Sequence, residues 1–332
     1  MRNKSFGWIC YFLVVWCCCF SRYSVAQELG STGLIAGTPF ERRIVQDGSA
    51  RNITYYISRP KLASAPIMLI IQGSGCTPVL TIRDGGVSSS IFNLEKFARD
   101  GKFTVVAVEK PFSGRGAKSG ADQSCSDAFN ADFTAETWHI ALKTALRDAR
   151  KLPWVDQRRT LVLGASEGAV MASVLAADDP TITDLISISG SGTTQLFDFV
   201  AQAYRGCFDT SACLANIESN VAAIKNDPQS STKFAWGHPY KRWTSFFAID
   251  PGELLLKSKA RVYIAIGTAD DSVPAISQEL AVAKLLLGRR DVTVRRVADG
   301  THSLNRQGAR NWDELERELY AALAWFSAVP TP

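Results

Sequence analysis

The clearest chemistry in the sequence is a serine held between two glycines. Residues Gly164-Ala165-Ser166-Glu167-Gly168 follow the pattern G-x-S-x-G. An apolar run at residues 161–163 precedes them as a candidate buried strand, and a small-residue helical pattern follows at 169–176. A strand–turn–helix of this kind holds a serine on a strained turn with its hydroxyl exposed, as a nucleophile requires. The alternative is an ordinary glycine-rich turn between a strand and a helix.

A serine nucleophile needs a base, and the sequence contains three histidines. His139 lies inside a helical pattern where Glu136 could pair with it, which favours a helix-surface or packed role. His238 precedes Pro239 in an irregular stretch and fits a loop or a pocket wall. His302 follows the last predicted strand, where a loop can carry it over the strand ends. His302 is therefore the candidate base.

The base needs an acid to orient it, and two adjacent aspartates follow the strand predicted at residues 262–266. Asp270 is nearer to the strand end, and we predict it as the acid. Asp271 could instead cap the helix that follows.

An oxyanion hole needs two fixed N–H donors. The backbone N–H of Glu167 is one candidate, because it lies at the start of the helix after Ser166. The turn at residues 72–75, Gln-Gly-Ser-Gly, follows the strand at 66–71 and could supply the Ser74 N–H as the second. The alternative for this turn is a tight turn without a catalytic role.

Together these residues resemble an α/β-hydrolase of the branch that holds dienelactone hydrolases and prolyl oligopeptidase-like serine peptidases. The chain order of Ser166, Asp270 and His302 is that of this superfamily. Residues 267–273, Gly-Thr-Ala-Asp-Asp-Ser-Val, are similar to the acid loop of those peptidases, in which the first aspartate belongs to the triad. Residues 154–156, Trp-Val-Asp, also resemble that branch's approach to the nucleophile. The resemblance covers residues 66–326 apart from an insertion.

Four features depart from that family pattern. Gln72 stands where many members have a histidine before the glycine, and Gly168-Ala169 replaces the usual pair of glycines. Ser166 stands where dienelactone hydrolases proper have a cysteine, and the N-terminal part is too short for a β-propeller. The resemblance therefore implies the fold and the triad, and says little about the substrate.

The elements that must position these residues alternate between strands and helices. Apolar runs predict strands at residues 42–45, 53–57, 66–71, 103–108, 161–163, 185–188, 262–266 and 292–297. Helical periodicity predicts helices at residues 92–98, 134–152, 169–176, 276–287 and 312–326, and residues 111–130 read as a loop. This alternation predicts an α/β fold, a mostly parallel central sheet with helices on both faces. Ligands of such sheets bind beyond the carboxyl ends of the strands.

Residues 194–259 interrupt the alternation, and we predict that they form a cap inserted in one domain spanning residues 27–332. An aromatic-rich stretch lies between Phe234 and Phe247. Within it, Trp236 and Trp243 are the candidate walls of the substrate pocket, since large rigid rings line ligand sites. The alternative is that these rings only pack the insertion onto the sheet.

The first 26 residues have the features of a signal peptide: two early basic residues, an apolar core and small residues before Gln27. We expect an exported protein, periplasmic or secreted, without a stable membrane span once the segment is removed. An uncleaved anchor is the alternative.

Removing the predicted signal peptide takes away three basic residues, so the formal net charge falls from +5 to +2. That balance argues against a nucleic-acid partner.

Four of the eight cysteines remain after the predicted signal peptide. An even number in an exported chain indicates disulfides, and four cysteines allow three pairings. We favour Cys207 with Cys213, six residues apart, and then Cys76 with Cys125; free buried thiols are the alternative. No cysteine or histidine spacing indicates a metal site.

These features predict an exported serine hydrolase that needs no cofactor and acts on a small-molecule ester. The rival enzyme class is a prolyl oligopeptidase-like peptidase acting on peptides, although no motif for gripping a peptide amine is recognisable. An acyltransferase, in which another acceptor replaces water, is a third possibility. From a different class comes a catalytically silent binding protein with the same fold.

Overall fold

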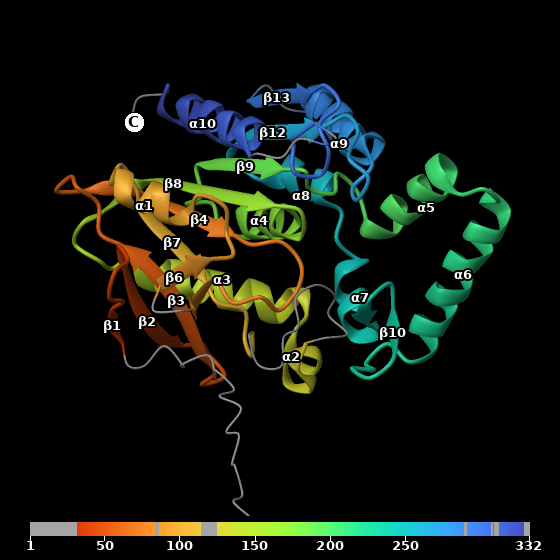
Figure 1. The fold of residues 1–332 in the computed structure, drawn as a ribbon, viewed down its shortest axis with the longest axis horizontal. Helices are drawn as coiled ribbons and strands as arrows, with labels where there is room; N and C mark the ends of the chain where they lie inside the picture. Colours follow the sequence, from red (N-terminus) through yellow and green to blue (C-terminus); the bar gives the residue numbers. More distant parts are fainter. Residues whose placement is uncertain are drawn as a thin grey trace, which may run out of the picture.

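A nine-stranded sheet forms the centre of the molecule (Figure 1). The structure is a computed structural model, and it describes residues 32–83, 86–113, 125–288, 291–306, 308 and 312–328. The predicted signal peptide lies outside these residues. In spatial order the strands are β1 (Gly33–Leu34), β2 (Phe40–Gln46), β3 (Asn52–Ser58), β7 (Thr104–Val108), β4 (Ala65–Ile71), β8 (Val155–Ala165), β9 (Asp184–Ile188), β12 (Arg261–Gly267) and β13 (Val292–Val297). The pairs β1–β2, β2–β3 and β3–β7 are antiparallel. The six strands from β7 to β13 in this order all pair in parallel.

Helices cover both faces of this sheet. One face carries α3 (Ala135–Ala149), α4 (Glu167–Asp178), α8 (Pro251–Lys257) and α9 (Ala275–Gly288), and the other carries α1 (Leu94–Asp100) and α10 (Asp313–Ser327). Side chains alternate between the two cores along each strand, as the two-residue period of a strand requires. In β4, Leu69 belongs to the first core, while Met68 and Ile70 belong to the second. The mostly parallel sheet between two helical layers confirms the predicted fold class.

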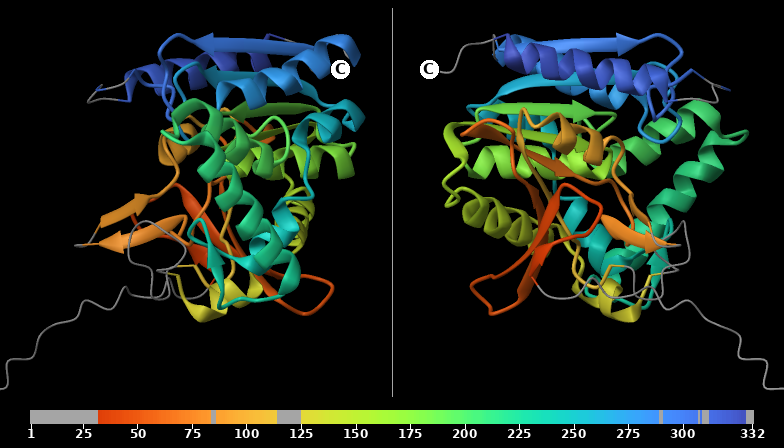
Figure 2. Two further views of the ribbon diagram at one scale, coloured as in Figure 1. Left: turned by 90° about the vertical axis from the view of Figure 1, so that its right-hand side faces the viewer. Right: turned by 60° about the vertical axis from the view of Figure 1, so that its left-hand side comes forward.

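Residues 194–247 stand out from the sheet beside its carboxyl end, and we call them the cap (Figures 1 and 2). They comprise α5 (Gln195–Gly206), α6 (Thr210–Asn226), the short hairpin of β10 (Phe234–Ala235) and β11 (His238–Pro239), and α7 (Tyr240–Phe246). A disulfide between Cys207 and Cys213 closes the turn from α5 to α6. The last helix of the predicted insertion, α8, joins the helical layer, where Leu255 is part of the first core.

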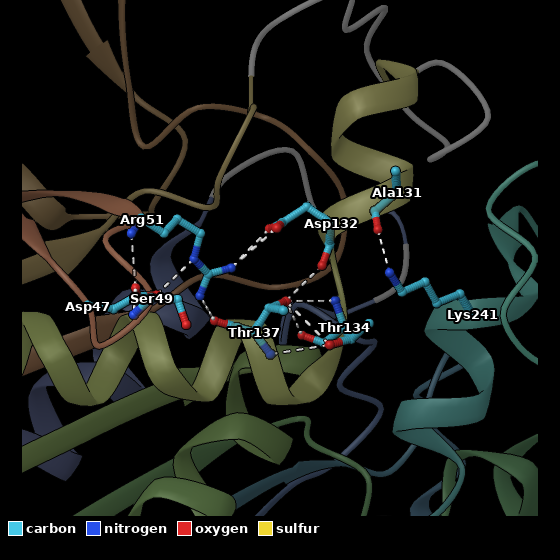
Figure 3. Close-up of polar contacts among 8 residues, drawn as sticks. All are labelled: Asp47, Ser49, Arg51, Ala131, Asp132, Thr134, Thr137 and Lys241. Carbon is cyan, nitrogen blue, oxygen red and sulfur yellow. Dashed lines mark hydrogen bonds and ion pairs between the residues drawn. The ribbon is translucent and has the colours of Figure 1, made fainter.

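A second disulfide joins Cys76, in the turn after β4, to Cys125, just before α2 (Asp127–Asp132). These are the two pairings that the sequence favours. Side chains on both sides fix α2 in place (Figure 3). Arg51 binds Asp132, with an Nη1–Oδ2 distance of 3.2 Å, and Lys241 of α7 donates to the carbonyl oxygen of Ala131. Through α2, the turn after β4 is connected to both the sheet and the cap.

A small hairpin, β5 (Leu80–Arg83) with β6 (Gly86–Ser89), extends from the loop between β4 and α1. No helix in the described ranges combines the length and the apolar composition needed to cross a membrane.

Candidate active site

Ser166 lies on a strained turn between β8 and α4. Its backbone has φ 56° and ψ −126°, a left-handed φ that non-glycine residues rarely adopt. The two flanking glycines allow this turn to pack closely. A Cβ on Gly164 would lie 2.2 Å from the carbonyl oxygen of Gly168, and one on Gly168 would lie 2.2 Å from that of Ile71. A side chain at Gly164 would therefore push the start of α4 away from β8, and one at Gly168 would push it away from β4.

Asp270 and His302 meet at the carboxyl ends of two neighbouring strands. Asp270 follows β12 and His302 follows β13, and these strands are parallel partners. The Nδ1 atom of His302 lies 2.9 Å from Oδ2 of Asp270. The other carboxylate oxygen, Oδ1, accepts hydrogen bonds from the backbone N–H groups of Ser272 (2.9 Å) and Val273 (2.8 Å). These bonds fix the carboxylate so that it can orient the imidazole.

The other candidates for base and acid lie elsewhere. Asp271 is exposed, whereas Asp270 is fully buried. His139 lies on α3 with its Nε2 atom 3.2 Å from Asp178 of α4, and His238 packs edge-on against Trp243 in the cap. Of the three histidines, the structure brings only His302 to Asp270.

The turn at residues 72–75 passes directly beside Ser166. A Cβ built on Gly73 would lie 3.5 Å from the Cβ atom of Ser166 and 4.0 Å from its Oγ atom. The backbone N–H of Ser74 lies in this turn, and Glu167 is the first residue of α4. Both predicted oxyanion donors thus belong to segments that border Ser166, and their binding of an oxyanion stays a prediction.

A buried ionic cluster that the sequence did not predict lies under this turn. The ammonium group of Lys110, which follows β7, lies 2.9 Å from Oε1 of Glu167. The guanidinium group of Arg242, from α7, binds the other carboxylate oxygen of Glu167. The side chains of Lys110 and Arg242 are only 0% and 2% exposed. Two signals could have drawn attention to them: a lysine two residues after a buried strand, and an arginine inside the aromatic-rich stretch.

The charge state of Glu167 follows from these contacts. Burial by itself would raise the pKa of this carboxyl, but the positive charges of Lys110 and Arg242 and their hydrogen bonds outweigh burial and lower it to about 2. Glu167 therefore carries a negative charge at neutral pH. It is the shared partner of both cations, so removing it would leave two buried positive charges uncompensated.

A second carboxyl lies close to Asp270. Burial raises the pKa of Asp198, on α5, to about 6, although hydrogen bonds with Ser277 and Ser191 act in the opposite direction. The negative charge of Asp270 raises it further. Asp198 is therefore mostly protonated below this pH, which limits the negative charge behind the catalytic candidates.

The two tryptophans predicted as pocket walls lie in the aromatic core of the cap. Trp243 is buried, and its indole N–H donates to the carbonyl oxygen of Ala235. Trp236 is half-buried and stacks on Phe199, with 4.4 Å between the ring centroids. The burial of Trp243 agrees with the packing alternative that the sequence left open, while Trp236 is only partly buried.

The described residues contain no group of three or more His, Cys, Asp or Glu side chains that could hold a metal ion.

Comparison with solved structures identifies the fold. The chain is similar to a puromycin-hydrolyzing peptidase of Mycobacterium tuberculosis, with 14% identity and a TM-score of 0.60 over 88% of this chain and 40% of that chain. It is also similar to an acetyl xylan esterase from Paenibacillus sp. R4, with 16% identity and a TM-score of 0.59 over 90% of this chain and 88% of that one. Est1E from Butyrivibrio proteoclasticus, solved with ferulic acid bound, matches with 18% identity and a TM-score of 0.57 over 86% of this chain and 98% of that one.

These likenesses show that the chain has an α/β-hydrolase fold like that of the S9 peptidases, as the resemblance in the sequence implied. The chain spans about two fifths of the length of the peptidases it matches: the match covers 40% of the puromycin-hydrolyzing peptidase and 42% of an acylaminoacyl peptidase of Pyrococcus horikoshii. No family model matches the sequence, and no curated protein matches it.

Proposed function

We propose that this protein is an exported serine hydrolase that cleaves small carboxylic esters through Ser166, His302 and Asp270. The observation that carries the proposal is the contact between His302 and Asp270 at the sheet edge that also bears the strained Ser166 turn. Such strain persists only where the surrounding structure imposes it, and it is typical of a nucleophile on this fold.

In the proposed reaction, the Oγ atom of Ser166 attacks the ester carbonyl carbon. Because Asp270 accepts a hydrogen bond from Nδ1 of His302, the Nε2 atom is free to take the serine proton. The oxygen of the tetrahedral intermediate becomes negative, and the N–H groups of Ser74 and Glu167 bind it. His302 then protonates the departing alcohol. Water, activated by the same imidazole, hydrolyses the acyl-enzyme and restores Ser166.

We favour esters over peptides because the sequence contains no recognisable motif for gripping a peptide amine. The matched structures include both esterases and peptidases. Peptide hydrolysis by a prolyl oligopeptidase-like mechanism is the second candidate, because the fold and the predicted triad serve both reactions.

The export part of the proposal rests on the apolar N-terminal segment and on the two disulfides. Disulfides persist in oxidising compartments such as the periplasm or the extracellular space.

Two measurements test this function. A fluorophosphonate probe should label the wild-type protein at Ser166, whereas a catalytically silent binding protein would stay unlabelled. Turnover of a short-chain aryl ester should then exceed turnover of an aminoacyl-proline amide. A higher kcat/KM for the amide would assign the protein to the peptidases instead. Ester cleavage that transfers the acyl group to an added alcohol faster than to water would indicate an acyltransferase.

A further inference from the structure

We propose that Lys110 is a positioning residue that holds and polarises the oxyanion-binding peptide group of this enzyme. The inference rests on the proposed serine hydrolase function and deepens it, because it assigns a role to a buried lysine outside the triad. It depends on what the three N–H groups of the lysine contact.

The ammonium group of Lys110 has three acceptors, one for each of its N–H bonds. The carbonyl oxygen of Gly73 lies 2.7 Å from Nζ, that of Gly75 lies 3.1 Å away, and Oε1 of Glu167 lies 2.9 Å away. A buried ammonium group needs an acceptor for each N–H bond, and two of the three acceptors here belong to the turn at residues 72–75. These two contacts hold that turn in place from below.

The contact with Gly73 bears directly on the oxyanion hole. The carbonyl oxygen of Gly73 and the N–H of Ser74 belong to the same peptide group, one at each end of its dipole. The positively charged ammonium group that donates to this carbonyl oxygen polarises the peptide group and makes its N–H a stronger donor, as in a chain of cooperative hydrogen bonds. The contact also holds the plane of that peptide at a set angle to Ser166, which lies beside Gly73.

The contact with Glu167 ties the second predicted donor to the first. The N–H of Glu167 is expected to bind the oxyanion from the start of α4, while its side chain accepts from Lys110. A single ammonium group thus connects both segments that carry oxyanion donors. Preorganised donors stabilise a developing negative charge because they need no reorientation during the reaction.

The surroundings of Lys110 increase the effect of its charge. The side chain is fully buried, and the ring of Phe133 lies 4.6 Å from the ammonium nitrogen. Electrostatic interactions are stronger in such a water-excluded environment than at the surface. The negative charge of Glu167 compensates the buried ammonium charge, and Arg242 of the cap binds the other carboxylate oxygen of Glu167.

The test compares the wild-type protein with Lys110→Met, which keeps the unbranched side chain up to Cε and removes its charge and donors. The substrate is para-nitrophenyl acetate, and the transition-state probe is an alkyl trifluoromethyl ketone, which forms a tetrahedral adduct with a catalytic serine. Removing one oxyanion donor lowers kcat by about 100- to 1000-fold, and an indirect effect should be smaller, so we expect roughly a 10- to 100-fold loss of kcat. KM should change little, and the affinity for the ketone should fall by a factor similar to that for kcat/KM.

Arg159→Met is the matched control, because Arg159 is also a buried cation and pairs with Asp184 at the opposite end of the sheet. It should lower the melting temperature and leave kcat and ketone affinity unchanged. If Lys110→Met does not fold, Lys110→Gln replaces it. A neutral amide that can still reach one carbonyl oxygen should give a smaller loss of kcat, on the order of tenfold, at unchanged KM.

Two outcomes would overturn the proposal. One is a folded Lys110 variant with the kcat and ketone affinity of the wild type. The other is a variant whose loss appears only in stability, as in the control. Failure of the underlying function looks different, because wild-type protein that neither reacts with a fluorophosphonate nor cleaves the ester would remove the hydrolase assignment itself.

Discussion

At the scale of single residues, the environment of Asp270 differs sharply from that of its neighbour Asp271. Asp270 is buried, and its Oδ1 atom has two backbone donors while its Oδ2 atom faces His302. Asp271 is exposed, and Ser272 Oγ contacts it at 3.4 Å. Only the first of these carboxylates is held rigidly enough to orient an imidazole.

This difference predicts unequal effects of the same substitution. Asp270→Asn should reduce kcat by about 10^4-fold, because an amide favours the wrong tautomer of His302. Asp271→Asn should leave kcat within about threefold of the wild type, as expected for an exposed side chain without a catalytic contact. Steady-state kinetics on a short-chain aryl ester measures both. A mild Asp270→Asn together with a crippled Asp271→Asn would mean that the acid is assigned to the wrong residue.

The triad candidates and the ionic cluster differ in how far the sequence could predict them. Ser166, Asp270 and His302 are each recognisable from a local feature, a glycine pattern or a polar residue after an apolar run. The cluster depends on pairs that are distant in the chain, since Lys110 and Arg242 lie 57 and 75 residues from Glu167. No local pattern shows which charged side chains will meet in the core, so that cluster could be found only in three dimensions.

At the scale of elements, the bridge between Cys76 and Cys125 connects the turn beside Ser166 to α2. It closes a loop with a sequence separation of 49 residues, whereas the bridge in the cap closes one of 6. In the chain-entropy model the stabilisation grows with loop length, from about 2 kcal/mol for the short loop to about 4 kcal/mol for the long one.

Removing the long bridge should therefore have two effects. The double variant Cys76→Ser/Cys125→Ser should lower the free energy of unfolding by about 4 kcal/mol and also reduce kcat, because the turn at residues 72–75 loses an anchor. Cys207→Ser/Cys213→Ser is the control and should lower stability by about half as much without changing kcat. Denaturant unfolding and ester kinetics give the two quantities. Equal losses in both variants, or peptide mapping that links Cys76 to Cys207, would refute this account.

The two tryptophans of the cap, one in the β10–β11 turn and one on α7, predict a second pair of contrasting variants. Trp236→Ala should change the ranking of esters with different acyl chains, shifting discrimination by roughly 1–3 kcal/mol, because Trp236 is half-buried and is our candidate pocket wall. Trp243→Ala should also change the ranking but lower the melting temperature more, since its ring and indole N–H are buried in the cap. The measurements are kcat/KM over a graded acyl series and the melting temperature. An unchanged ranking in both variants would leave the rings with a packing role alone.

Elements with strong internal patterns were predicted well, and those that depend on distant contacts were not. The strand expected at residues 66–71 is β4, and the helix expected at 276–287 is α9. Residues 111–130 were expected to be a loop, but their end contains the start of α2. That helix has six residues, and Arg51 and Lys241 stabilise it from other parts of the chain. Short helices of this kind have little stability of their own, so their own residues do not predict them.

At the scale of the whole molecule, the central sheet separates two cores, and polar side chains buried beside them make stability depend on pH. Glu109, at the end of β7, accepts hydrogen bonds from the backbone N–H of Val79 and the hydroxyl of Ser113. Burial nevertheless raises the pKa of Glu109 from 4.5 to about 7. In the folded protein it therefore holds its proton at pH values where the unfolded chain has lost it.

The sign of the pH effect follows from this difference. Between pH 4.5 and about 7 the folded state binds more protons at Glu109 than the unfolded state does, so its contribution to stability falls as the pH rises. Glu109→Gln cannot titrate. The free energy of unfolding of the wild type relative to this variant should decrease across that window by at most about 3 kcal/mol. Denaturant unfolding at several pH values measures the difference. A difference that stays constant or increases with pH would show that the folded pKa of Glu109 is not raised.

The central claim for the molecule is that Ser166 and His302 act as one catalytic unit. Its most direct test is the kcat of Ser166→Ala, His302→Ala and the double variant on the same aryl ester. Each single variant should lose on the order of 10^4-fold or more, and the double variant should be little worse, because residues that act as a unit do not contribute additively. Substantial turnover by Ser166→Ala, or losses that multiply in the double variant, would contradict the account.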